Sequence, residues 1–269
     1  MVKKIKKALI GVLLVVCAIG ISACGIGGNK DFEYMKERTI MKVTIQSTRD
    51  KSYKFTVTDE QVIQDIYNIL SSGTIVEEKS TMDADYILEI YESPTEIKTF
   101  NYVAGLDKKD GGNFYNDDNK YIISKRLDND IIKNFANIRR PIDFQHVYYT
   151  SIMGVIEKYN SSLETKPKIG LNINSDIMSL RFQISMEMEA FKRKLDKVNN
   201  VVFMDDTMKA EDFDVVMSVN TQGYTSKRYK AIIEIKGGVG EKPIKYYVNN
   251  AYDDGEWDIQ ISEEMPDGF

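Results

Sequence analysis

Residues 40–57, IMKVTIQSTRDKSYKFTV, decide how the globular part of the chain begins. Two stretches of alternating apolar and polar residues flank the polar turn 47–52, and such alternation is typical of strands with one buried face. The apolar residues on that face are Met41, Val43 and Ile45 in the first stretch and Tyr53, Phe55 and Val57 in the second. A polar turn between two such stretches predicts a β-hairpin.

An amphipathic helix is predicted immediately after the hairpin. Thr58 can cap its first turn, and Gln61, three residues later, completes a possible capping box. Gly73 ends the helical pattern. The apolar residues that share one helical face are Val62, Ile63, Ile66, Tyr67 and Leu70.

Further strand patterns and a second helix complete the first half of the chain. The predicted strands are Ile75–Glu78, Tyr86–Glu92, Glu96–Val103 and Tyr121–Ser124, and the predicted helix is Leu127–Ile138. Residues 105–119, which are dense in Gly, Asn and Asp, are predicted to form a loop. Residues 39–140 are therefore expected to form an α+β module in which helices cover one sheet.

Residues 141–167 are predicted to connect this module to a second one. Asp143 can cap a helix that runs to about Tyr159. The residues that follow, 160–168, are polar, show no periodicity and contain Pro167, which is typical of a linker.

Residues 168–269 predict a second α+β module with a different order of elements. A strand over 168–174, the long helix Asp176–Val198 and a strand over 201–204 form a βαβ unit. Four strands follow as an antiparallel meander, over 213–220, 228–236, 244–249 and 256–262, and Asp254-Gly255 suits the last hairpin turn. The predicted fold class is thus α+β, with two small modules that each combine a sheet with helices.

The first module carries a family resemblance. The helix at 59–70, the stretch DADYILEI at 83–90 and the late strand YIIS at 121–124 resemble the YhfM-like domain of lipoproteins from low-GC Gram-positive bacteria. The resemblance covers residues 39–138 and implies a small extracytoplasmic α/β module. It brings no catalytic signature with it.

The N-terminus has the features of a bacterial export signal. Residues 1–7 contain four lysines, and an uncharged stretch of 16 residues follows from Ala8 to Ala23. This stretch is too short to span a bilayer, which takes about 20 residues, but it suits the apolar region of a signal peptide.

The leader ends in Ile21-Ser22-Ala23-Cys24, which resembles the lipobox of bacterial lipoprotein signal peptides. The resemblance implies cleavage before Cys24 and a diacylglyceryl thioether on its sulfur, which would hold the protein at the extracytoplasmic face of the cell membrane. Residues 1–23 are then the signal peptide, and residues 24–38, which begin glycine-rich, are expected to form a flexible tether. The alternatives are a plain secretory signal or an uncleaved anchor, with Cys24 incidental in both.

The cysteines and the charge exclude several classes of function. Cys17 would be removed with the leader, so the mature chain keeps only the alkylated Cys24, which excludes disulfides, cysteine metal sites and a catalytic thiol. Removing the four leader lysines from the 36 basic residues leaves 32 against 41 acidic ones, a formal net charge of −9. We expect neither nucleic acid nor an anionic membrane surface to attract such a chain, so the lipid must provide the membrane attachment.

Candidate residues for metal or catalytic chemistry are few. His146 is the only histidine, which argues against a zinc site and favours a packed or rim position for it. The loop acids Asp107, Asp110, Asp117 and Asp118 are calcium candidates, but their spacing does not match an EF-hand and a solvated turn is the favoured explanation. We expect no cofactor.

Four aromatic residues gather in the last predicted strands: Tyr246, Tyr247, Tyr252 and Trp257. Alternation places Tyr246 and Tyr247 on opposite faces of their strand. An exposed strip of such residues could stack on a sugar or bind a partner protein. The simpler explanation is that aromatic residues favour strands.

Together these features favour a membrane-anchored, extracytoplasmic lipoprotein that acts as a non-enzymatic binding or interaction module of the cell envelope. Its expected partner is a cell-wall component, an envelope protein or a small ligand. One alternative is an envelope hydrolase with paired carboxylates, which cannot be picked out among 41 acidic residues without geometry. Another is a sensory or spore-envelope lipoprotein that acts through partners.

Overall fold

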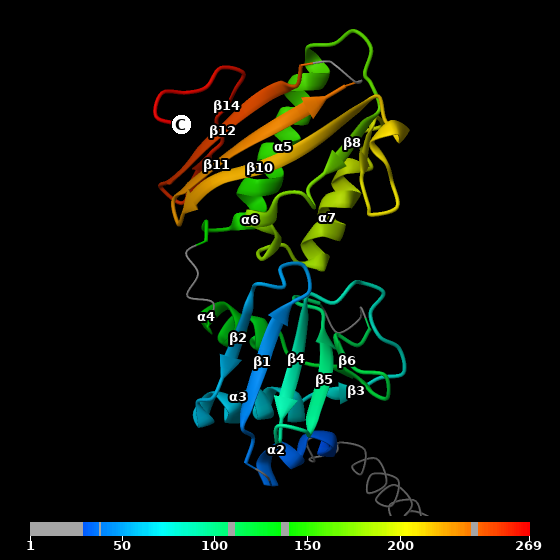
Figure 1. Ribbon diagram of the computed structural model, residues 1–269, viewed down its shortest axis with the longest axis vertical. Coiled ribbons are helices and arrows are strands. Elements are labelled where there is room, and N and C mark those ends of the chain that lie inside the picture. Colours follow the sequence, from blue (N-terminus) through cyan, green and yellow to red (C-terminus); the bar gives the residue numbers. More distant parts are fainter. Residues whose placement is uncertain (1–28, 38, 107–110, 136–139, 238–241) are drawn as a thin grey trace, which may run out of the picture.

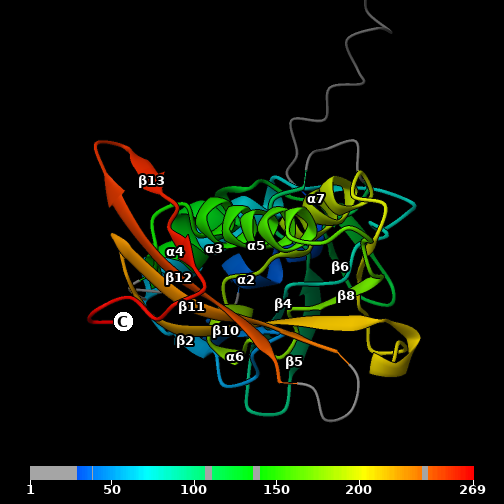
Figure 2. The same ribbon diagram turned by 90° about the horizontal axis from the view of Figure 1, so that it is seen from above.

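Two modules are stacked along the long axis of the protein (Figure 1). The computed structural model describes residues 29–37, 39–106, 111–135, 140–237 and 242–269. Each module contains a seven-stranded sheet. The longer helices lie on the same side of both sheets (Figures 1 and 2). The predicted α+β class, with two sheet-plus-helix modules, is confirmed.

The N-terminal module is built on an antiparallel sheet with the strand order β2-β1-β4-β5-β6-β7-β3. Its strands are β1 (Lys42–Ser47), β2 (Lys54–Val57), β3 (Thr74–Ile75), β4 (Tyr86–Tyr91), β5 (Ile97–Tyr102), β6 (Phe114–Tyr115) and β7 (Lys120–Ile122). Its later helices are α3 (Glu60–Ser71), the π-helical segment η3 (Leu127–Ile132) and α4 (Lys133–Phe135). Side chains from the sheet and from α3 and η3 share one buried core.

The predicted hairpin and the helix after it are confirmed. Strands β1 and β2 pair antiparallel, with Ile45 opposite Phe55. The helix begins one residue later than expected, because Asp59 rather than Thr58 caps it. The Asp59 carboxylate accepts a hydrogen bond of 3.0 Å from the N–H of Val62.

The predicted loop 105–119 is wrong in part, because strand β6 lies within it. Phe114 is fully buried and stacks on Phe100, with ring centroids 4.6 Å apart. Beside it, the side chain of Asn113 bonds the backbone of Ile123 twice, accepting at 2.8 Å and donating at 3.1 Å. The Asn113 side chain thus makes the hydrogen bonds that a neighbouring strand would make. Because Asn is common in turns, the composition of residues 105–119 wrongly predicts a loop throughout.

The sequence predicts a flexible tether over residues 24–38, but the described part of it is folded. The 3₁₀ turn η1 (Lys30–Phe32) and the short helix α2 (Tyr34–Glu37) lie at the end of the N-terminal module (Figure 1). Phe32 is fully buried, with its ring centroid 5.0 Å from that of Tyr121 and 5.8 Å from that of Phe100. The N–H of Asn29 donates to the carbonyl of the last residue of α3 at 2.6 Å. Residues 29–37 are therefore part of the folded module.

The C-terminal module contains the predicted βαβ unit and antiparallel meander. Its strand order is β13-β12-β11-β10-β8-β9, with β14 paired to β12, and β8 runs parallel to both of its neighbours. The strands are β8 (Ile169–Asn172), β9 (Val201–Phe203), β10 (Val215–Thr225), β11 (Arg228–Lys236), β12 (Ile244–Asp253), β13 (Glu256–Asp258) and β14 (Ile261–Ser262). Asp254 and Gly255 form the expected turn, with positive φ angles of 47° and 91°.

Helix α5 (Phe144–Ser161) lies in the segment 141–167 that was expected to connect the modules, yet it is part of the C-terminal core. Val147, Ile152 and Val155 are fully buried in the same cluster as the apolar side chains of β8, β10 and β11. The polar residues after α5 join it to β8 within this module. The chain therefore passes between the modules before α5, not after it.

The predicted helix Asp176–Val198 is wrong as one element, because it is divided into α6 (Ile177–Leu180) and α7 (Ser185–Leu195). Asp176 is 2% exposed, and its carboxylate accepts hydrogen bonds from the N–H (3.1 Å) and the hydroxyl (2.7 Å) of Thr221. Phe182 turns into the core, whereas the apolar Ile177 at the start of α6 is 70% exposed. Contacts with distant residues thus override the helical period.

Asp85 holds the two modules together. Its side chain is 1% exposed. It accepts hydrogen bonds from the guanidinium of Arg49 (2.5 Å), the N–H of Ala104 (2.8 Å) and the N–H of Ser185, the first residue of α7 (2.7 Å). On either side of Ser185, Ile184 and Met186 pack against apolar clusters of the N-terminal module. The break between α6 and α7 therefore serves the contact between modules.

Candidate functional site

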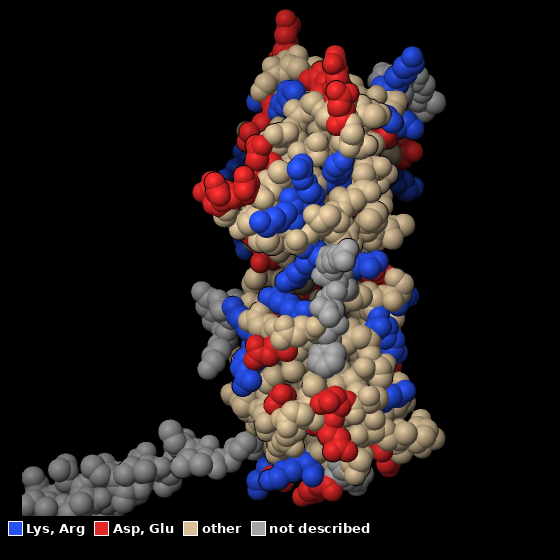
Figure 3. All heavy atoms as spheres, turned by 90° about the vertical axis from the view of Figure 1, so that its left-hand side faces the viewer, with Lys and Arg blue, Asp and Glu red and all other residues tan. Residues whose placement is uncertain are grey.

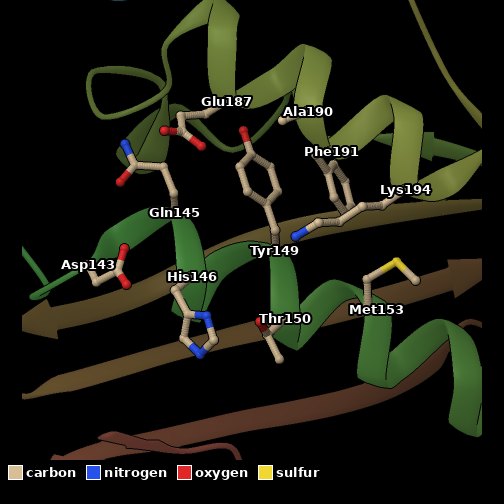
Figure 4. Close-up of a pocket in the computed structure, with 10 residues that line it drawn as sticks. All are labelled: Asp143, Gln145, His146, Tyr149, Thr150, Met153, Glu187, Ala190, Phe191 and Lys194. Carbon is tan, nitrogen blue, oxygen red and sulfur yellow. The ribbon is translucent and has the colours of Figure 1, made fainter. Parts of the chain in front are cut away.

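A groove between α5 and α7 is the candidate site (Figure 4). It encloses about 290 Å³. Its lining is Asp143, Gln145, His146, Tyr149, Thr150 and Met153 from α5 and its N-cap, and Glu187, Ala190, Phe191 and Lys194 from α7. Residues three or four positions apart share a helical face, so each helix presents one stripe of side chains to the groove.

Two stacked aromatic rings join the helices at the groove. The rings of Tyr149 and Phe191 have centroids 4.3 Å apart and an interplanar angle of 21°. Tyr149 is 7% exposed and Phe191 is 2% exposed. Because both rings are held by packing, the polar groups around them have a rigid support.

The hydroxyl of Tyr149 is buried and has no hydrogen-bond partner among the described residues. Figure 4 shows it pointing toward α7, beside Glu187. Burial, reinforced by the negative charge of Glu187, raises the pKa of Tyr149 above its ordinary value, so the hydroxyl stays protonated and available as a donor. Buried polar groups in folded proteins are nearly always paired, and a water molecule or a polar group of a ligand in the groove would supply the partner of this one.

We predict that Tyr149→Phe stabilises the free protein by about 1 kcal/mol, because it removes an unpaired buried hydroxyl. The neighbouring Tyr148→Phe is the matched control, since the Tyr148 hydroxyl accepts a hydrogen bond of 3.3 Å from Ser179. That change should lower the stability by about the same amount. Urea unfolding of both variants checks the prediction, and a destabilised Tyr149→Phe would contradict it.

Charged side chains surround the aromatic pair. Asp143 and Glu187 belong to the N-terminal ends of α5 and α7, and Lys194 lies near the C-terminal end of α7. Asp143 has a φ of 46°, which is uncommon for a residue other than glycine, and makes no side-chain cap hydrogen bond. His146 is exposed at the rim (Figure 4). The groove thus offers carboxylates toward one end and an ammonium group toward the other.

A larger hollow of about 490 Å³ lies in the N-terminal module, lined by residues such as Leu106, Ile122 and Ser124. None of its lining residues carries a buried polar atom that lacks a partner in the described part of the chain. We therefore favour the smaller groove, because of these two hollows it is the one whose lining includes such an atom.

The four aromatic residues predicted as a binding strip are not brought together on the surface. Tyr246 and Trp257 are 2% and 8% exposed, and the indole N–H of Trp257 donates to the carbonyl of Ile142 at 2.7 Å. Tyr252 packs against Trp257, with centroids 5.4 Å apart. Tyr247 lies on the opposite face, as alternation predicts, where the ring of Phe269 meets it at 5.2 Å. These residues serve the core and the C-terminal segment.

Two of the calcium candidates, Asp107 and Asp110, lie outside the described residues. Asp117 and Asp118 are exposed in a tight turn, where the Asn116 side chain accepts a hydrogen bond of 3.1 Å from the N–H of Asp118. Within the described ranges no three His, Cys, Asp or Glu side chains gather as a metal site would require. Turn chemistry therefore explains Asp117 and Asp118.

The lipobox residues Ile21, Ser22, Ala23 and Cys24 also lie outside the described residues. Across the part of the chain that is described, every helix is too short or too polar to cross a bilayer.

Burial raises the pKa values of three carboxyl groups above the ordinary value for aspartate. The three groups lie in separate places, so they do not form a carboxylate pair. Asp85 is at the module junction, Asp128 accepts a hydrogen bond from the hydroxyl of Tyr102 in the N-terminal module, and Asp176 accepts from Thr221 in the C-terminal one. None of the three lines the α5–α7 groove.

Asp176 predicts a specific pH dependence. Burial raises its folded-state pKa above the ordinary value of 3.8, so between these two values the folded state keeps a proton that the unfolded state has lost. The contribution of Asp176 to stability therefore falls as pH rises through this window. We expect Asp176→Asn to become more stable relative to the natural protein as the pH rises above about 4. Urea unfolding across this range checks it, and parallel pH profiles would contradict it.

The sequence did not indicate the groove. Tyr149 lies beside the buried apolar residues Val147, Tyr148 and Ile152 of α5, and an aromatic residue in that position is the one signal of a second packing partner. Glu187 and Lys194 lie within the predicted helix Asp176–Val198, and nothing in its pattern distinguishes them as site residues. Their convergence depends on the pairing of α5 with α7, which sequence periodicity does not encode.

Comparison with known proteins identifies the first module only. Residues 36–141 match the family model described as YhfM protein, which confirms the resemblance of the N-terminal module. The match spans less than half of the chain and ends just before α5, so the groove lies beyond it. No curated protein and no solved structure matches the chain.

Proposed function

We propose that the protein is a lipid-anchored, extracytoplasmic binding protein of the cell envelope that holds a polar group of its partner in the α5–α7 groove. The observation that carries the binding role is the buried, unpartnered hydroxyl of Tyr149 in that groove. A volume of about 290 Å³ suits a small polar ligand or one moiety of a wall polymer or envelope protein.

The leader supports the anchoring part of the proposal. Residues 21–24 have the lipobox pattern, and the cationic start and short apolar stretch before them suit an exported precursor. A mature chain of net charge −9 gains nothing from an anionic membrane, so two acyl chains on Cys24 would supply the attachment.

Photo-crosslinking in intact cells tests the binding role. A benzophenone amino acid at His146, on the groove rim, is expected to capture a wall fragment or an envelope protein. The same amino acid at Ser161, exposed at the other end of α5, is the matched control. An adduct specific to position 146 that is lost in Tyr149→Phe supports the groove. Equal capture at both positions would contradict it.

One observation favours the hydrolase alternative: Asp143 and Glu187 line the same groove. Paired carboxylates are the minimum set for general acid–base hydrolysis of glycosidic bonds. This alternative predicts release of soluble fragments from isolated cell walls, and loss of that release in Glu187→Gln. Glu189→Gln is the control, because Glu189 pairs with Lys192 at 2.6 Å outside the groove. The binding proposal predicts that neither the natural protein nor either variant releases soluble fragments.

A further inference from the structure

We infer that one end of the N-terminal module rests on the membrane surface and that the C-terminal module points away from it. This end, the base, comprises Lys30–Glu37, Met41 and the β4–β5 turn with its flank, Glu92–Ile97. The inference rests on the proposed lipid at Cys24. It adds an orientation and a lipid contact surface that anchoring alone does not require.

The chain between the lipid and the fold is short. Only five residues lead from Cys24 to Asn29, and fully extended they reach about 18 Å. Asn29 is bonded to the end of α3, and Phe32 is buried in the core, so the fold begins immediately there. A module of this size is roughly 30 Å across. The tether is therefore too short for an inverted arrangement in which the C-terminal module touches the membrane and the base faces away from it.

The base and the C-terminal module lie at opposite ends of the long axis (Figure 1). Side-chain contacts fasten α2 to the β4–β5 region. The Lys98 ammonium lies 3.6 Å from the ring centroid of Tyr34 and 3.6 Å from the carboxylate of Glu92. The module junction around Asp85 fixes the second module beyond the first. A membrane at the base therefore leaves the α5–α7 groove in the distal module.

Two large apolar side chains are exposed at the base. Met41 is 50% exposed and Ile97 is 42% exposed. They flank the end of β4 from its two sides, since the N–H of Met41, just before β1, donates to the carbonyl of Tyr91, and Tyr91 pairs with Ile97 on β5. Apolar side chains held at the headgroup level by a nearby lipid gain by entering the interface.

Charge disfavours a molecule that lies flat on the membrane. The mature chain carries 32 basic and 41 acidic residues, so an anionic leaflet repels its bulk. On the face drawn in Figure 3, acidic and basic side chains are both present at the base and above it. The base itself carries five acidic residues and two lysines, so charge does not favour it, and the short tether and the two apolar residues select it.

Single-cysteine fluorescence on vesicles tests the orientation. The mature chain has no free thiol once Cys24 is alkylated, so an introduced cysteine is labelled without background. Met41→Cys and Ile97→Cys report on the base. Met178→Cys and Ile244→Cys, 41% and 45% exposed in the C-terminal module, are controls matched in residue type and exposure. Full-length lipidated variants are placed on anionic phosphatidylglycerol vesicles that contain nitroxide-labelled lipids.

We expect several-fold stronger quenching at positions 41 and 97 than at 178 and 244. Equal quenching at all four positions, or stronger quenching in the C-terminal module, would overturn the orientation. Failure of the anchor is a different result, because a chain without lipid would not float with the vesicles at all. Unchanged urea unfolding of the labelled variants shows that the exposed positions tolerate the change.

Discussion

Replacing Cys24 by serine is expected to abolish fatty-acid labelling of the protein and its normal processing. Serine has no thiol for the thioether, so neither acyl chain can be attached. Each buried methylene contributes about 0.8 kcal/mol to membrane binding, so losing two acyl chains removes the whole affinity of the mature chain. Labelling cells with a radioactive fatty acid measures attachment of the lipid. The size of the labelled or immunodetected chain shows its processing, and separation of membrane and soluble fractions measures its membrane binding.

Cys17→Ser is the matched control within the same chain. Cys17 lies in the apolar leader, which is removed by the proposed cleavage before Cys24. Labelling and mature size should therefore be unchanged in this variant. Persistent labelling of Cys24→Ser, or loss of labelling in Cys17→Ser, would contradict the assignment of the lipid.

Phe32→Ala is expected to lower the free energy of unfolding by about 3–5 kcal/mol. The ring is fully buried among Phe100, Phe114 and Tyr121, so its loss leaves a cavity in the aromatic core. This is a large fraction of the stability of a module of this size. The effect would be surprising for a flexible tether, which is how the composition of residues 24–38 reads.

Glu33→Ala is the control for this prediction, because Glu33 is exposed in the same segment. A surface change of this kind should stay within about 0.5 kcal/mol. Urea unfolding of the chain without its leader, with Cys24→Ser in all samples, compares the variants. Equal stabilities of Phe32→Ala and Glu33→Ala would show that the segment is not part of the folded module.

Local patterns predicted those elements whose contacts are close in sequence or periodic. The hairpin of β1 and β2, the helix α3 and the terminal meander follow from alternation, a helical stripe and turn residues. The turn at Asp254-Gly255 is an example, since its two positive φ angles need residues of this kind. The match over residues 36–141 agrees with the resemblance drawn from the same local patterns.

Contacts between distant residues account for what the sequence did not predict. The division of α6 from α7 depends on Asp176 reaching Thr221 and on Ser185 reaching Asp85, 100 residues away. The groove depends on Tyr149 meeting Phe191. The burial of Phe32 depends on rings contributed by β5, β6 and β7. None of these pairs leaves a periodic trace in the sequence.

Mass spectrometry of the protein purified from the membranes of its host tests the proposed anchor most directly. We predict a chain that begins at Cys24 and whose N-terminal peptide carries the added mass of a diacylglyceryl group, or of that group and a third acyl chain. Peptides covering residues 1–23 should be absent. An unmodified Cys24, or a mature chain that still carries the leader, would contradict the proposal.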